Sequence, residues 1–140
     1  MRVTLSGEEL RLVGLFEDVT GANAYDCLVE DDRVVFLVAT GQMGQAIGTG
    51  GENVARLERR LDRDVRLVED AATPEEFVAN ALTPAAVYNV TVSESETGTT
   101  AYAEVPDGDR GAAIGSGGRN IEAARRLADR HYDIDEIELT

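Results

Sequence analysis

A ten-residue, glycine-rich segment occurs twice in this chain and is the part best suited to binding a ligand. It reads G-Q-A-I-G-T-G-G-E-N at residues 44–53 and G-A-A-I-G-S-G-G-R-N at residues 111–120, with seven of ten positions identical and an offset of 67 residues. Glycines allow backbone dihedrals and close approaches that a side chain would block. A helix that starts after such a loop presents N–H groups and a positive dipole end to an anion. The segment therefore predicts two anion-binding loops, one in each half of the chain.

Arginines follow both loops and suggest which anion is bound. Nine of the 13 arginines lie in residues 52–66 and 119–130, which together carry a net charge of +3, whereas the rest of the chain carries −17. Arginines one to three turns beyond a loop could flank a sugar-phosphate chain; these are Arg56, Arg59, Arg60, Arg63, Arg119, Arg125 and Arg126. The alternative is that they only pair with Glu58, Asp62 and Asp129 on solvated helix faces.

The net charge of −14 argues at first sight against a polyanionic partner. All 13 basic residues are arginine, and the chain has no lysine. This composition resembles that of proteins from extreme halophiles, whose acidic surfaces keep them solvated in concentrated salt. The total charge therefore indicates a salt-rich solvent and gives little information about the binding partner.

The elements around the loops repeat with the same offset. Ser6-x-x-Glu9 and Thr73-x-x-Glu76 are capping-box patterns 67 residues apart. Hydrophobic periodicity and turn residues then predict the order αββααβ twice. In the first half we expect a helix at 8–17, strands at 25–29 and 34–38, a short helical turn at 44–47, a helix at 53–61 and a strand at 65–68. In the second half we expect a helix at 74–82, strands at 87–92 and 100–105, helices at 109–114 and 120–130, and a strand at 134–139.

This order, with Ile-Gly-x-x-Gly between the second and third helices, resembles the type II KH domain, whose GXXG loop clamps single-stranded nucleic acid. The glycine three residues before the isoleucine and the asparagine two residues after the last glycine are similar to the tandem KH domains of the NusA family, above all its short archaeal members. The resemblance covers nearly the whole chain. It implies an α+β fold of two tandem type II KH domains, at 1–71 and 72–140, each with a three-stranded sheet packed on helices.

Carried over by position, the resemblance implies that two loops and their flanking helices contact RNA. Four apolar residues, Ile47, Val54, Ile114 and Ile121, would line the grooves beside which bases lie. The remaining expected contacts are Gly48, Thr49, Gly50, Gly51, Asn53, Arg56, Arg59 and Arg60 in the first domain and Gly115, Ser116, Gly117, Gly118, Arg119, Asn120, Arg125 and Arg126 in the second.

One departure from the family concerns the two inner loop positions, where the family usually has Lys or Arg. Here they are Thr49-Gly50 and Ser116-Gly117. Since the Debye length is only about 3 Å at 1 M salt, exposed cation–phosphate contacts weaken steeply in a salty cell. We expect binding to depend instead on loop N–H groups, the two hydroxyls and base contacts, and so to show a shallow dependence on salt.

The function implied by the resemblance is that of a non-enzymatic, cytoplasmic RNA-binding factor in transcription elongation, termination or antitermination. Its partners would be single-stranded RNA and RNA polymerase, with no membrane, small-molecule substrate, metal or cofactor. Two alternatives stay open: a KH module in ribosome biogenesis or RNA decay, and an interaction scaffold with degenerate loops.

Other candidate sites are weaker. The G-x-G-x-x-G order of dinucleotide-binding loops is absent, and a lysine-free chain excludes the G-x-x-x-x-G-K-[ST] phosphate loop. Cys27 is the only cysteine and is expected in the core on a strand face with Tyr25 and Val29. His131 is the only histidine and lacks the partners of a catalytic site. The loops could also be purely structural glycine turns that pack two helices.

Overall fold

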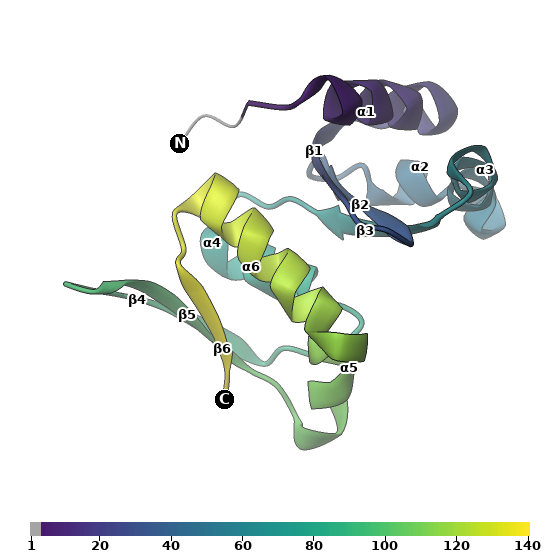
Figure 1. Ribbon diagram of the computed structural model, residues 1–140. Coiled ribbons are helices and arrows are strands. Elements are labelled where there is room, and N and C mark those ends of the chain that lie inside the picture. Colours follow the sequence, from purple (N-terminus) through teal and green to yellow (C-terminus); the bar gives the residue numbers. More distant parts are fainter. Residues whose placement is uncertain (1–3) are drawn as a thin grey trace. The chain divides into compact units, whose positions relative to one another are not determined.

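A helix, two strands, a short helix, a longer helix and a third strand follow one another in each half of the chain (Figure 1). The computed structural model describes residues 4–140 and separates them into two units, 4–70 and 71–140. The first three residues of the predicted 1–71 domain lie outside the described part. Each unit is described by itself below.

The first unit is built on a three-stranded sheet. Its elements are α1 (Gly7–Thr20), β1 (Ala24–Val29), β2 (Arg33–Val38), α2 (Met43–Ile47), the 3-10 turn η1 (Thr49–Gly51), α3 (Glu52–Leu61) and β3 (Asp64–Glu69). The strand order is β1-β2-β3, in which β2 runs antiparallel to β1 and parallel to β3. The helices lie on one face of the sheet (Figure 1).

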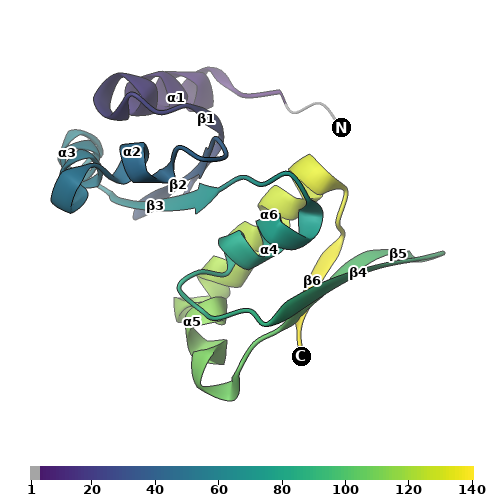
Figure 2. The same cartoon turned by 180° about the vertical axis from the view of Figure 1, so that it is seen from behind.

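The second unit repeats this topology. Its elements are α4 (Pro74–Ala81), β4 (Asn89–Ser95), β5 (Gly98–Glu104), the 3-10 turn η2 (Asp107–Asp109), α5 (Arg110–Ile114), the 3-10 turn η3 (Ser116–Gly118), α6 (Arg119–Tyr132) and β6 (Glu136–Leu139). The order β4-β5-β6 again combines an antiparallel and a parallel pair, and α4 and α6 cover one face (Figure 2). The predicted fold of two type II KH domains is confirmed.

The capping signals place the helix starts as the sequence suggests. Ser6 Oγ accepts a hydrogen bond from Glu9 N at 3.2 Å, and Glu9 Oε1 accepts one from Ser6 N at 3.0 Å. At the start of α4, Thr73 Oγ1 accepts one from Glu76 N at 3.2 Å. These bonds satisfy N–H groups that have no partner inside the helix.

Each unit has its own apolar interior with a stacked aromatic pair. In the first, the rings of Phe16 and Phe36 stack with centroids 4.8 Å apart, and both side chains are fully buried. In the second, Phe77 stacks on Tyr132 with centroids 4.7 Å apart. The pairs join a helix to the sheet in one case and two helices in the other, which fixes the helical layer of each unit.

Two strand predictions need correction. Tyr25 and Cys27 do not share a face, because the pairing of β1 with β2 shifts register between Ala24 and Asp26. This irregularity leaves Tyr25 53% exposed, whereas Cys27 is buried as predicted. In the second unit the first strand starts at Asn89 and continues to Ser95, beyond the predicted 87–92, because backbone pairing with β5 extends along polar residues that carry no hydrophobic signal.

The stacked pair of the first unit provides a stability test. Phe16→Ala should lower the free energy of unfolding by about 3–5 kcal/mol, because it removes a buried ring and leaves a cavity. Leu10→Ala, in the same helix at a position that is 59% exposed, is the matched control and should change it little. Thermal and denaturant unfolding in molar KCl measure both, and equal losses in the two variants would contradict the assigned core.

Candidate nucleic-acid interface

The two glycine loops have the same backbone conformation. Gly48 and Gly115 have φ/ψ of 77°/168° and 79°/169°. The third and fourth loop residues are left-handed in both copies, with φ of 63° at Gly50 and Gly117 and near 80° at the last glycine. The first position lies in a region that only glycine occupies readily. The loop conformation therefore requires glycine at its first position in both units.

An asparagine after each loop holds this conformation in place. Asn53 Nδ2 donates to the carbonyl of Gln45 at 2.9 Å, and Asn120 Nδ2 donates to that of Ala112 at 3.3 Å. Each bond links the first turn of the helix after the loop to the short helix before it. A Cβ added at Gly48 would come within 2.8 Å of Asn53 Cγ. These asparagines therefore position the loops, and their expected contact with RNA stays a prediction.

The helices after the loops start without a side-chain cap, unlike the helices that open the two units. Among the described residues, no side-chain cap bonds the start of α3 or α6, whose N-cap residues are Gly51 and Gly118. The N–H groups of Glu52 and Arg119, the first helical residues, donate to the carbonyls of Thr49 and Ser116 in the 3-10 turns before them. The positive end of each helix dipole favours an anion at this point. Thr49 and Ser116 are exposed beside these groups and add a hydroxyl each.

The four apolar residues expected in the grooves are placed unequally. Ile47 and Ile114, at the ends of α2 and α5, are 39% and 38% exposed. Val54 is half-buried, and Ile121 is only 6% exposed. Ile121 therefore belongs mainly to the interior, while the two isoleucines before the loops present apolar surface that could face a base.

The arginines also divide into two groups. Arg59, Arg60 and Arg126 are exposed, and Arg56 is exposed while paired with Glu52 at 2.9 Å. Arg119, the first residue of α6, is half-buried. These five arginines lie on the helices that follow the loops.

Arg125 differs from the other predicted arginines. It pairs with Glu122 and Glu136 and donates to the carbonyl of Ile137 at 3.0 Å. These bonds attach α6 to β6, so this side chain serves the fold.

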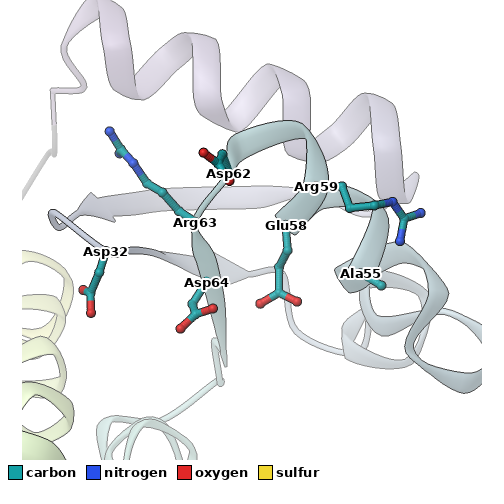
Figure 3. Close-up of a pocket in the computed structure, with 7 residues that line it drawn as sticks. All are labelled: Asp32, Ala55, Glu58, Arg59, Asp62, Arg63 and Asp64. Carbon is teal, nitrogen blue, oxygen red and sulfur yellow. The ribbon is translucent and has the colours of Figure 1, made fainter.

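A hollow of about 610 Å³ lies on the first unit between the second half of α3 and the start of β3. Figure 3 shows the carboxylates of Asp32, Glu58 and Asp64 pointing to the same side of it. The other lining residues are Ala55, Arg59, Asp62 and Arg63. Four of the lining residues thus carry a carboxylate and two carry a guanidinium group, which makes the hollow a poor site for a phosphate.

The topology and the paired GXXG loops define a protein of the tandem type II KH class. Models of two families match the chain: the KH domain over residues 13–72, and the NusA-like second KH domain over residues 74–140. With relatives of up to 63% identity over nearly their full length, the chain belongs to the NusA family.

The similar proteins come mainly from archaea. "Probable transcription termination protein NusA" of Halococcus morrhuae is 63% identical over 139 residues, 99% of both chains. The protein of the same name from Halobacterium salinarum strain R1 is 60% identical over the full length of both. That from Methanocaldococcus jannaschii is 32% identical over 99% of this chain and 75% of its own. The predicted NusA-like protein of a halophilic archaeon is confirmed.

A solved structure supports the fold independently. The crystal structure of APE1850 superposes with a TM-score of 0.83 at 31% identity, covering 97% of this chain and all of that one. Within residues 4–140, no helix is both long and apolar enough to cross a membrane.

The requirement for the first loop glycine can be tested directly. Gly115→Ala should disrupt the loop, because the residue has positive φ and its Cβ would lie 2.7 Å from Asn120 Cγ. Gly111→Ala is the matched control, since that helical glycine has nothing within 4 Å of an added Cβ and should gain up to about 1 kcal/mol. Thermal melts and RNA binding measure both. Equal RNA affinity of the two variants would contradict the requirement.

Proposed function

We propose that this chain binds single-stranded RNA through its two GXXG loops and acts in transcription termination or antitermination. The observation that carries the RNA-binding part is that α3 and α6 start without a side-chain cap, behind loops of identical conformation. The N–H groups of Glu52 and Arg119 donate to the carbonyls of Thr49 and Ser116. The phosphate would therefore be attracted by the positive end of each helix dipole, and an exposed isoleucine beside each loop would face a base. This arrangement needs no loop lysine.

The proposed interface consists of both loops and the residues that flank them. Ile47, Thr49, Gly50, Arg56, Arg59 and Arg60 contribute in the first domain, and Ile114, Ser116, Gly117, Arg119 and Arg126 in the second. Asn53 and Asn120 hold the loops in shape. No reaction is assigned, since RNA binding and release require only these contacts.

The transcription role is supported by the names of the relatives, which are transcription termination proteins. The proposal includes contact with RNA polymerase and a location in the cytoplasm. Copurification of tagged protein from cells tests this part: RNA polymerase subunits in the bound fraction support it, and ribosomal particles in their place would point to ribosome biogenesis.

The RNA-binding part is tested by replacing Thr49-Gly50 and Ser116-Gly117 with Asp-Asp. The new carboxylates would lie at the proposed phosphate sites, so affinity for a fluorescent single-stranded RNA should fall by about tenfold or more in molar KCl. Fluorescence anisotropy measures the change. Unchanged binding would favour a scaffold with degenerate loops.

A charge-matched control separates a local effect from the added negative charge. It carries four aspartates at exposed positions outside the loops: Ala72, Ser93, Thr97 and Thr140. Circular dichroism checks that both variants remain folded, and only the loop variant should lose affinity.

Salt dependence tests which contacts carry the binding. For the unchanged chain, the logarithm of affinity should fall only slightly with the logarithm of KCl concentration, because no cation stands at the inner positions of either loop. Thr49→Lys with Ser116→Lys should steepen this slope by about 0.7 for each new phosphate contact. Thr49→Gln with Ser116→Gln is the neutral control. A steep loss for the unchanged chain, at salt concentrations where it stays folded, would count against binding through backbone and hydroxyl groups.

A further inference from the structure

The two loops share one backbone conformation but differ in the charge that follows them. Glu52 is the first residue of α3, and Arg119 is the first residue of α6. Both residues come directly after the last loop glycine and lie in the turn whose N–H groups would meet a phosphate. A carboxylate there repels the phosphate, whereas a guanidinium attracts it. The same position thus opposes the ligand in one domain and favours it in the other.

A second matched position carries opposite charges as well. Glu58 and Arg125 are each the seventh residue of their helix. Glu58 Oε2 accepts a hydrogen bond from Val65 N at 2.9 Å, and Arg125 donates to the carbonyl of Ile137 at 3.0 Å. Both bonds attach the helix to the third strand of its unit. The structural task is the same, but the side chain that performs it carries the opposite charge.

The difference in charge between the two domains extends along the first two turns of α3 and α6. In the first eight residues of α3, two arginines are balanced by two glutamates, whereas in those of α6 three arginines face one glutamate. The first unit also has the hollow of Figure 3, where four carboxylates outnumber two guanidinium groups. At the matched start of the third strand of the second unit, the Asp135 carboxylate accepts a hydrogen bond from Thr99 N at 2.7 Å. That carboxylate is therefore bonded to the backbone, as Glu58 is in the hollow of the first unit.

Concentrated salt decides which of these charges matters most. Screening over about 3 Å at 1 M salt removes the influence of distant charges and leaves that of groups adjacent to the phosphate. Among the differing positions, the first helical residue is adjacent to the loop in sequence and in the helix turn. Glu52 and Arg119 should therefore dominate the difference between the domains.

We propose that the two KH domains bind RNA unequally and that the second domain, through the loop 115–118 and Arg119, is the primary anchor for the RNA backbone. The first domain is the weaker site and engages RNA that the second domain already holds. This inference rests on the proposed RNA-binding function and assigns the stronger site to one of its two loops.

The unmodified chain allows a direct test by NMR. A single-stranded RNA of about five nucleotides, close to the four that one KH loop clamps, is titrated into the ¹⁵N-labelled protein in molar KCl. The amide signals of Gly115, Gly117 and Gly118 should move at lower RNA concentration than those of Gly48, Gly50 and Gly51. Simultaneous movement, or earlier movement of the first loop, would overturn the inequality. If no loop signal moves even at the highest RNA concentration reached, the proposed RNA-binding function itself is contradicted.

A reciprocal charge exchange gives an independent test. Arg119→Glu should lower affinity for a longer RNA by about tenfold, and Glu52→Arg should raise it. Because a carboxylate in the first helical turn favours the helix dipole, Arg119→Glu should not unfold the domain. Melting temperature checks this point, and Arg119→Gln should give an intermediate affinity. Unchanged binding of Arg119→Glu, or weaker binding of Glu52→Arg, would contradict the assignment.

Discussion

The feature on which the rest depends is a helix start that lacks a side-chain cap. Gly51 and Gly118 provide no side chain to bond the first N–H groups of α3 and α6, in contrast to Ser6 and Thr73 at the other two long helices. The first N–H group of each helix donates instead to a carbonyl of the 3-10 turn before it, from Glu52 to Thr49 and from Arg119 to Ser116. The glycine dihedrals and the asparagine bond hold this helix start in place, so that the positive end of the helix dipole faces the loop.

The acidic composition is compatible with an RNA ligand, because repulsion by the net charge and the contacts at the loop act over different distances. A net charge of −14 would repel RNA in dilute buffer. In concentrated salt this field extends only about 3 Å, so hydrogen bonds and apolar contacts at the loop decide binding. The same screening explains why Thr49 and Ser116 can stand at loop positions that a cation would otherwise suit: in molar salt, an exposed lysine contributes less to affinity than in dilute buffer.

The sequence predicted those parts of the structure that depend on local signals. Glycine spacing, capping boxes and the repeat offset located the loops, the helix starts and the element order, because each signal acts within a few residues. The parts it missed depend on pairing between distant segments. The irregular register of β1 arises from its contact with β2, and the bonds of Arg125 reach a strand that begins eleven residues later. The sequence did contain a signal for the positioning role of the asparagines, since Asn53 and Asn120 are the last residues of both copies of the repeat. Only the structure shows the carbonyls to which they donate.

Because the two domains share one backbone conformation, the residues at their matched positions can be compared directly. Positions that the loop geometry requires are the same in both copies, as at Gly48 and Gly115 or at Asn53 and Asn120. Positions that need only attach the helix to its strand differ in charge, as Glu58 and Arg125 do. Since either charge can perform the structural task, that task does not explain the difference. The charge also differs at Glu52 and Arg119, directly beside the loops, and the proposed difference in what each loop holds would account for that contrast.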